Sequence, residues 1–312
     1  MTAFVVVNPH SAGGRTGREW AIIAQELRDV YSDLKVAETR NRGQATALVR
    51  NALQGGYREI VAVGGDGTIN EAINGFFDQE RSIAPDAVFS FITSGTGGDF
   101  RKSFGIAPSW QAAVDRLKTR SATPVDVGRV SCLGALGTPL VRHFINIGSF
   151  GLSGAVVDSV NRARIAKLFG GKFAFGFHSA LDMLTYRERA VRLRIDNGFD
   201  ETVSVSTVAI ANGQYFGGGM RVAPNAEPGD GVFEIVVMGG VPKSQAMAET
   251  KLLYTGTHIG RPHVRAFRGR KVTAAALPET KCRPVLIELD GENAGRLPAT
   301  FDILPGALKL RC

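Results

Sequence analysis

The sequence predicts an α/β plus β protein with two domains. A Rossmann-like domain with a parallel sheet is expected over residues 1–128, and a mainly antiparallel β-sandwich domain over residues 129–299. Three observations lead to this. The 312 residues are too many for one ordinary core and suit two domains. Short apolar runs alternate with helical patterns up to about residue 127, and glycine-bounded runs of alternating apolar and polar residues follow.

The alternation in the first part predicts strands that are parallel, because parallel neighbours need a helix-length crossover between them. The apolar runs at residues 3–7 and 59–63 are β-branched at most positions, as in a strand buried on both faces. The expected strands cover residues 3–7, 34–38, 59–63, 87–92 and 123–127, and the expected helices cover residues 15–30, 43–54, 69–77 and 109–120.

The second part has a density of short strands that favours a sandwich. The expected strands cover residues 142–147, 190–195, 202–211, 232–238, 271–276 and 285–289, with helices over residues 152–167 and 243–254. The boundary near Arg129 follows from this change of pattern alone, since no repeat or flexible linker marks it. The segment 300–312 is a candidate for a last strand that completes the first domain.

Composition limits the compartment and the partners. Hydrophobic residues at 44% and charged residues at 21% are typical of a folded protein. The net charge of 37 − 29 = +8 favours an anionic partner, whether a nucleotide, an anionic lipid surface or nucleic acid. Three cysteines without metal-ligand spacing indicate a reducing compartment. No signal peptide or apolar run of about 18 residues is found, so we expect a cytoplasmic protein that reaches a membrane only from outside it.

The most informative stretch is EIVAVGGDGTINE at residues 59–71, where an apolar run meets a glycine-rich turn and then a helical pattern. Gly64, Gly65 and Gly67 lack a Cβ, so backbone N–H groups can approach a phosphate at the helix start. Asp66 adds a carboxylate that suits Mg²⁺ binding or proton abstraction from a hydroxyl. The alternative is a tight turn in which Asp66 only caps the helix.

Two further acidic residues follow neighbouring strands. Asp99 lies in the glycine-rich stretch 94–101, which leaves the strand expected beside that of Asp66, and Asp126 ends the next one. Together Asp66, Asp99 and Asp126 are expected to hold Mg²⁺, mostly through waters. The alternatives are that the stretch 94–101 is an ordinary glycine-rich loop and that Asp126 is a turn residue. Near the end of the chain, Asp290 and Glu292 flank a glycine, which suits either a hairpin turn or a catalytic carboxylate.

These motifs together resemble the diacylglycerol kinase catalytic-domain family, of the bacterial lipid kinase type, which is related to sphingosine kinases and more distantly to NAD kinases. The resemblance continues through FINIG at residues 144–148, NGQYFGGGM at 212–220, APNA at 223–226 and GDG at 229–231. It departs at Gly98, where the family usually has Asn, and at Gly229, where it usually has Asp or Asn. The resemblance implies an ATP-dependent lipid kinase that phosphorylates a lipid hydroxyl, foremost that of diacylglycerol. An NAD kinase-like enzyme and an inactive nucleotide- or lipid-binding regulator are the alternatives.

The resemblance also assigns roles to residues. Glu292 is implied as the acceptor of the lipid hydroxyl proton, beside Asp290, and Asp66 is its rival. A second, structural Mg²⁺ or Ca²⁺ is implied at Asp230, with backbone carbonyls of Glu227 and Val232, where the alternative is a plain turn. The nucleotide-binding residues implied are Asn8, Pro9, Thr39, Gly64, Gly65, Asp66, Gly67, Thr68, Asn70, Gly95 and Thr96.

Basic stretches suggest how such an enzyme reaches its substrate. Arginines and lysines gather at residues 162–172, 187–194 and 261–271. Solvated faces explain many such stretches, but we expect some of these side chains to contact anionic lipid head groups at the membrane surface. The expected partners are therefore a lipid substrate and a second copy of the chain in a homodimer, and no nucleic acid.

Overall fold

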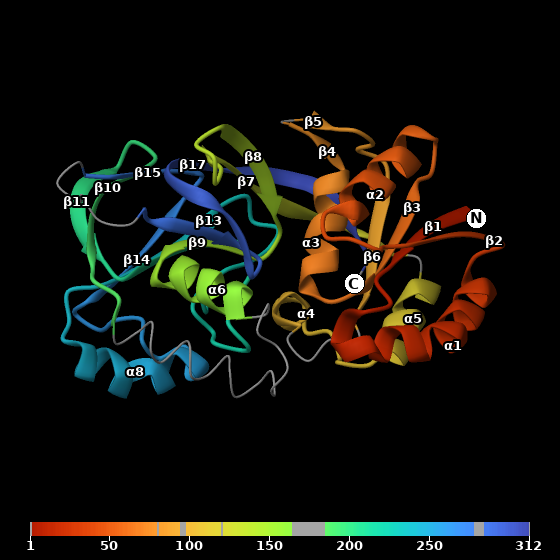
Figure 1. Cartoon of the computed structure of the whole chain (residues 1–312), viewed down its shortest axis with the longest axis horizontal. Coiled ribbons are helices and arrows are strands. Elements are labelled where there is room, and N and C mark those ends of the chain that lie inside the picture. Colours follow the sequence, from red (N-terminus) through yellow and green to blue (C-terminus); the bar gives the residue numbers. More distant parts are fainter. Residues whose placement is uncertain are drawn as a thin grey trace.

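The computed structural model describes residues 2–79, 81–93, 98–119, 121–163, 185–277 and 284–311. The chain forms two lobes side by side, one of parallel sheet and helices and one mainly of antiparallel strands (Figure 1). Both termini lie in the first of these lobes (Figure 1). The predicted fold class, a parallel-sheet α/β unit followed by a β-sandwich, is confirmed.

The first lobe is built on four parallel strands: β1 (Thr2–Val7), β2 (Asp33–Glu38), β3 (Glu59–Gly64) and β6 (Val88–Thr93), in the order β6, β3, β1, β2. Every residue of β3 is buried, as its unbroken apolar pattern predicts for a central strand. The carboxyl ends of these strands therefore share one edge of the sheet, where ligands of such folds bind.

Helices cover both faces of this sheet. On one face lie α1 (Arg15–Val30) and α5 (Trp110–Thr119), whose Ile23, Leu27 and Val114 share a core with the strands. On the other face lie α2 (Gln44–Gln54) and α3 (Asp66–Gly75). The predicted positions of all four helices agree with the structure to within three residues at each end.

The second lobe is a sandwich whose two layers share the long strand β17 (Glu292–Leu310). One layer has the order β14, β13, β12, β9, β16, β17, and the other has β11, β10, β15, β17, β7, β8. Phe150, Phe233 and Phe301 pack between the layers. The strands are β7 (Thr123–Leu133), β8 (Pro139–Phe144), β9 (Ile147–Gly151), β10 (Arg189–Ile195), β11 (Phe199–Val205), β12 (Thr207–Ala211), β13 (Phe233–Met238), β14 (Val264–Gly269), β15 (Lys271–Ala276) and β16 (Leu286–Leu289).

Two predicted strands are wrong because the chain breaks within them. The run 142–147 is divided between β8 and β9, since the N–H groups of Ile145, Asn146 and Ile147 donate to the Asp290 carboxylate. The run 202–211 is divided at Ser206. There the chain exchanges hydrogen bonds with the carbonyl of Met238 and the N–H of Leu152.

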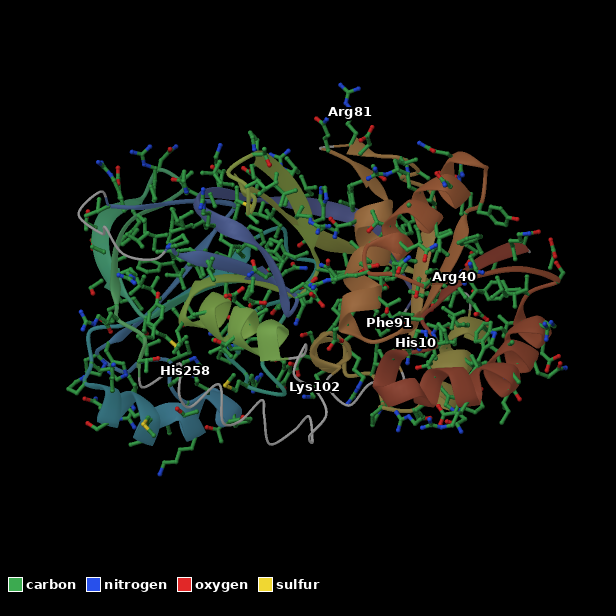
Figure 2. The ribbon with its side chains drawn as sticks, in the orientation of Figure 1. His10, Arg40, Arg81, Phe91, Lys102 and His258 are labelled. Carbon is green, nitrogen blue, oxygen red and sulfur yellow. The ribbon has the colours of Figure 1, made fainter. Side chains whose placement is uncertain are left out.

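Several elements were not predicted at all. They are the 3-10 turn η1 (Ser11–Gly14), the small hairpin of β4 (Phe77–Asp78) and β5 (Arg81–Ser82), the short helix α4 (Asp99–Ser103) and the strand β14. Arg81 projects from the hairpin away from the body of the molecule (Figure 2). The two helices of the second lobe, α6 (Leu152–Ala163) and α8 (Lys243–Thr255), were predicted.

The lobes share strands. β7 runs straight through the predicted boundary at residue 128, and β17 pairs with β16, β15 and β7 before its last residues pair in parallel with β6. Just beyond β17, the Arg311 guanidinium binds both carboxylate oxygens of Glu59, at 2.7 and 2.9 Å, with Tyr31 alongside. The final segment of the chain is thereby tied into the first lobe.

Candidate active site

The glycine turn lies at the carboxyl end of β3 and opens α3. Gly64 has no room for a side chain, because a Cβ there would lie 2.7 Å from the side chain of Thr68. Gly65 is extended, and nothing lies within 4 Å of its Cβ position. No side chain caps α3. The space beside Gly65 is therefore open, and a helix start without a capping side chain fits an anionic group such as a phosphate.

Other predicted nucleotide-binding residues lie on the same edge of the sheet. Asn8 follows β1 and donates from Nδ2 to Thr68 Oγ1 at 3.1 Å, and the carbonyl of Pro9 accepts the N–H of Gly17. Thr39 follows β2, is buried, and donates its N–H to Val7. Gly95 and Thr96 lie outside the described residues. His10, next in the chain after Pro9, lies near this edge (Figure 2).

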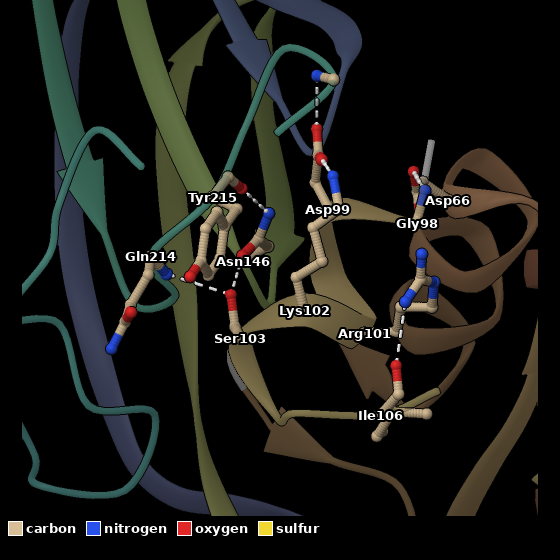
Figure 3. A network of polar contacts seen from close by, with 11 residues as sticks. Asp66, Gly98, Asp99, Arg101, Lys102, Ser103, Ile106, Asn146, Gln214 and Tyr215 are labelled. Carbon is tan, nitrogen blue, oxygen red and sulfur yellow. Dashed lines mark hydrogen bonds and ion pairs between the residues drawn. The ribbon is translucent and has the colours of Figure 1, made fainter. Parts of the chain in front are cut away.

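Asp66 has one carboxylate oxygen to spare. Its Oδ2 accepts the N–H of Gly98 at 3.1 Å, whereas its Oδ1 is buried and has no hydrogen-bond partner (Figure 3). Burial, and after it the charges of Asp99 and Asp290, together raise the pKa of Asp66 to about 6. A buried carboxylate oxygen without a partner beside a second carboxylate is a donor set that fits a divalent cation.

The short helix α4 connects the glycine turn to the second lobe (Figure 3). Asp99 pairs with Lys102 Nζ at 2.9 Å and accepts the N–H of Gly218 at 2.7 Å. Ser103 donates to Asn146 Oδ1 at 3.1 Å and accepts the N–H of Gln214 at 3.0 Å. Lys102 thus lies at the junction of the lobes, as Figure 2 also shows. The ion pair of Lys102 with Asp99 was not predicted, although a lysine three residues after Asp99 was a signal in the sequence.

Gly98, which departs from the family pattern, has a structural reason in this chain. Its φ is +57°, which favours glycine, and a Cβ there would lie 2.6 Å from Nε of Arg101. Arg101 in turn donates to the carbonyl of Ile106 at 2.9 Å. Arg101 therefore fills the space a side chain at residue 98 would need, and the backbone N–H of Gly98 supplies the hydrogen bond to Asp66.

The turn at Asp290 brings the second lobe to the glycine turn. Asp290 accepts four hydrogen bonds at 2.8–3.0 Å, and these come from Asn70 Nδ2 and the N–H groups of Ile145, Asn146 and Ile147. Burial raises its pKa, and these donors oppose that shift. With both oxygens occupied, Asp290 organises the turn. Asn70 donates from Nδ2 to Asp290 and to the His143 carbonyl, and its binding of the nucleotide stays a prediction.

Glu292 lies directly against the glycine turn. A Cβ on Gly67 would lie 2.9 Å from Glu292 Oε1, so the missing side chain makes room for this carboxylate. Glu292 also forms an ion pair with Arg42, which precedes α2. The structure therefore brings both candidate proton acceptors, Asp66 and Glu292, to one place. The contribution of Arg42 was missed, and nothing in the sequence around it pointed to the distant Glu292.

Asp126 does not join Asp66 and Asp99, so the predicted three-carboxylate metal site is wrong in this respect. Its side chain is 1% exposed and accepts the N–H groups of Gly231 and Gly306, each at 2.7 Å. Asp126 thereby connects the loop 228–231 to β17. Within the part of the chain that the structure describes, no three His, Cys, Asp or Glu side chains are grouped as a metal site needs. A cation would thus rely on the free Oδ1 of Asp66, with waters completing its shell, because Lys102 and the N–H of Gly218 occupy the two oxygens of Asp99.

The predicted structural cation site at Asp230 does not fit the residues present. The Asp230 carboxylate pairs with the Arg268 guanidinium and accepts the N–H of Val232 at 3.1 Å. The carbonyl of Glu227 accepts the N–H of Gly229 at 2.7 Å. An arginine cation therefore takes the place that a metal ion would occupy.

The predicted basic stretches are largely paired with acidic side chains where the structure describes them. Arg192 and Arg194 both bind Asp200, and Arg265 binds Glu201. The side chains of residues 160–184, which carry the first stretch, lie outside the described residues. Among the described helices, none is both long enough and apolar enough to span a membrane.

A parallel sheet with a glycine turn at its carboxyl edge, faced by a sandwich that contributes carboxylates, defines a kinase of the two-lobed type. Family models agree with this assignment. Residues 2–130 match the diacylglycerol kinase catalytic domain, and residues 146–312 match the YegS C-terminal NAD kinase beta sandwich-like domain. The chain belongs to this family of kinases.

Relatives of known name cover nearly the whole chain. A diacylglycerol kinase of Staphylococcus haemolyticus is 26% identical over 96% of this chain and 84% of its own length. A diacylglycerol kinase of Bacillus subtilis is 25% identical over 96% of this chain and 92% of its own length. The crystal structure of a diacylglycerol kinase from Bacillus anthracis str. Sterne has a TM-score of 0.71 at 18% identity, covering 99% of this chain and 96% of that one. Yeast NADH kinase has a TM-score of 0.53 at 10% identity. The match covers 99% of this chain and 82% of that one, which shows a shared fold.

Proposed function

We propose that this protein is an ATP-dependent lipid kinase that transfers the γ-phosphoryl group to a lipid hydroxyl, and that diacylglycerol is the acceptor. One observation carries the proposal. The glycine turn that fits a phosphate, the unpartnered oxygen of Asp66 and the carboxylate of Glu292 come from both lobes and meet at one junction. The name shared by the relatives supports diacylglycerol as the acceptor.

In the proposed reaction, the N–H groups at the start of α3 bind the phosphates, and Glu292 takes the proton of the lipid hydroxyl. A bond forms between that oxygen and the γ-phosphorus while the bond from the γ-phosphorus to the bridging oxygen breaks, which leaves ADP. Asp66 would hold Mg²⁺ through its free Oδ1, and the metal would offset the negative charge of the phosphates when bound. Asp290 holds the turn that carries Glu292.

Glu292 is favoured over Asp66 as the base because the two carboxylates have different surroundings. The carboxylate of Asp66 accepts its hydrogen bond from Gly98 of the same lobe, and its free Oδ1 is the atom that fits a cation. Glu292 comes from the second lobe, and its Oε1 lies beside Gly67 of the first. A carboxylate so positioned can accept a hydroxyl proton as the attack proceeds. Attachment to a membrane surface and a homodimer stay predictions.

The test is a phosphorylation assay with labelled ATP, Mg²⁺ and mixed micelles that contain diacylglycerol, phosphatidylglycerol, ceramide or sphingosine. NAD serves as the soluble acceptor. We expect phosphatidic acid from diacylglycerol as the main product. Phosphorylated NAD would overturn the lipid assignment, and ATP binding without any product would favour a regulator.

The role of Glu292 is tested with Glu292→Gln, which retains the size and removes the base. We expect kcat to fall about 10²- to 10⁴-fold, as for loss of a general base, with little change in ATP affinity. Glu201→Gln is the matched control, because Glu201 is an exposed partner of Arg265. Equal activity of Glu292→Gln and this control would exclude Glu292 as the base.

A further inference from the structure

A second buried glutamate lies next to the candidate base, and the reaction above does not use it. Glu288 is on β16, two residues before Asp290, and is 2% exposed. Its neighbours Ile287 and Leu289 point into the sandwich core. Because side chains alternate along a strand, Glu288 points to the opposite face, as does its partner Ser149 on β9. The helix α6 packs against this region of β9 and β16.

The Glu288 carboxylate connects the catalytic turn to α6. Its Oε2 accepts the N–H of Gly291 at 2.8 Å, and Gly291 stands between Asp290 and Glu292. Its Oε1 lies 2.6 Å from Ser149 Oγ, which lies 2.6 Å from Ser153 Oγ in the first turn of α6. The backbone turns sharply here, with φ of 50° at Asp290 and 85° at Gly291.

The serine chain has two proton arrangements, because each hydroxyl has one proton to donate. When Glu288 is ionised, Ser149 donates to it and Ser153 donates to Ser149. When Glu288 is protonated, it donates to Ser149, and Ser149 donates to Ser153. In the first arrangement the hydrogen bond from Gly291 ends on an ionised carboxylate, and such bonds are about twice as strong as neutral ones.

We propose that Glu288 is a positioning residue for Glu292: its ionised carboxylate holds the Gly291 amide and thereby the orientation of the base at the glycine turn. This inference rests on the proposed role of Glu292. Asp290 holds one end of the turn through four donors, and Glu288 holds the residue immediately before Glu292. Without Glu288, the Gly291 N–H loses its partner and Glu292 loses its fixed direction.

The groups around Glu288 are mainly acidic. Asp290 faces it from the turn and Asp99 from α4, and both raise its pKa. On α6, Asp158 accepts a hydrogen bond from Asn293, the residue opposite Glu288 on β17. Burial is the largest cause of the shift, which brings the pKa of Glu288 to about 7. Ionisation, and with it the stronger hydrogen bond to Gly291, is therefore completed only above neutral pH.

The test compares Glu288→Gln with the wild type over pH 5.5–9. The glutamine retains an acceptor for Gly291 and a donor for Ser149 but stays neutral. We expect kcat to fall about tenfold at pH 8, in proportion to the weakened hydrogen bond, with an unchanged KM for ATP. We also expect the decline of wild-type kcat below pH 7 that comes from protonation of Glu288 to be absent from the variant. A wild-type kcat and pH profile in Glu288→Gln would overturn the proposal.

Ser149→Ala is the second variant, in case Glu288→Gln does not fold. It removes a donor that favours the ionised carboxylate, so the acidic limb of the kcat profile should move to higher pH. An unmoved limb would contradict the proposal. Glu201→Gln again serves as the control that should change neither kcat nor the profile.

A readout without turnover separates this proposal from the lipid kinase assignment. Amide hydrogen exchange at Gly291, measured at pH 8 in the intact protein, should be about tenfold faster in Glu288→Gln than in the wild type. If the wild type phosphorylates no acceptor, the proposed function fails, while this exchange still tests whether Glu288 holds the turn. Equal exchange in both proteins would show that it does not.

Discussion

The glycine turn at Asp66 and the turn at Asp290 meet at the junction of the lobes, yet their two aspartates differ in how many hydrogen bonds they accept. Asp290 receives four hydrogen bonds, so both of its oxygens have partners within the protein. Asp66 receives one bond on Oδ2 from Gly98, and its buried Oδ1 receives none. Both pKa values are raised, but only Asp66 has an oxygen left for a ligand.

This difference indicates which aspartate stabilises the fold and which is available for catalysis. A buried charge without partners costs stability, and a protein retains one where a bound ion or substrate compensates it. A buried charge with all partners present is costly to alter, because each partner then loses its acceptor. The same substitution, Asp to Asn, should therefore have opposite consequences at the two turns.

Asp66→Asn should have the largest effect, and it should fall on activity. Asparagine can still accept the Gly98 N–H, but it offers no charge to a cation, so we expect turnover to fall at least about 10³-fold while the fold is retained. Kinase assays and thermal unfolding on the same preparation measure both quantities. Asp200→Asn, at an exposed carboxylate, is the control. More than a tenth of wild-type activity in Asp66→Asn would contradict the assignment.

Asp290→Asn should act mainly on stability. An amide group cannot accept bonds on both sides, so two of the four donors lose their acceptor, and we expect a loss of roughly 2–4 kcal/mol in the free energy of unfolding. Urea denaturation monitored by circular dichroism would measure this. An Asp290→Asn protein as stable as the wild type would remove the distinction between the two turns.

The pH dependence of stability should sharpen the comparison. The pKa of Asp66 is about 6 in the folded protein and about 3.8 when unfolded, so the folded protein binds this proton more tightly. Its contribution to stability is therefore greatest below pH 4 and is lost as the pH rises to about 6. Relative to the wild type, Asp66→Asn should gain roughly 2–3 kcal/mol between pH 4 and pH 7. If the difference in unfolding free energy between Asp66→Asn and the wild type stays constant from pH 4 to pH 7, this would argue against a raised pKa of Asp66.

Asp230 should show the smallest effect, since Arg268 already compensates its charge. We expect Asp230→Asn to change the unfolding free energy by less than about 1 kcal/mol, as for other exposed ion pairs. Added Mg²⁺ or Ca²⁺ should change the melting temperature of the wild type and of this variant by the same amount, because any cation bound at Asp66 is common to both. A cation-dependent increase in the wild type that is absent from Asp230→Asn would restore the predicted structural site.

The sequence predicts well what depends on neighbours along the chain. The strand β3, the glycine turn and α3 follow from an apolar run, three glycines and a helical period, all within residues 59–77. Helix α1 is predicted at its true ends, because its pattern is long and regular. The family resemblance adds that Asp66 and Glu292, more than 200 residues apart, are both candidate proton acceptors of one site, which no local pattern contains.

Contacts between distant segments could not be predicted in this way. The break between β8 and β9 arises from the Asp290 carboxylate, about 145 residues away, which takes the N–H groups that a strand would use. Asp126 looked like a third ligand because it ends a strand beside Asp99. Its oxygens instead bind Gly231 and Gly306, two glycines whose position depends on the folding of the second lobe. Arg42 likewise meets Glu292 only in the folded chain.

The strand β17 has a consequence for how this molecule moves. It begins at Glu292 beside the glycine turn, crosses the second lobe and ends in the parallel sheet of the first, and β7 accompanies it over much of that length. The pairing of β17 with β7 is irregular between Leu304 and Leu308 and resumes beyond it, so two paired strands join the lobes in place of a flexible linker. We therefore expect the lobes to unfold in a single transition, and a substrate to enter through movement of the loops around the junction.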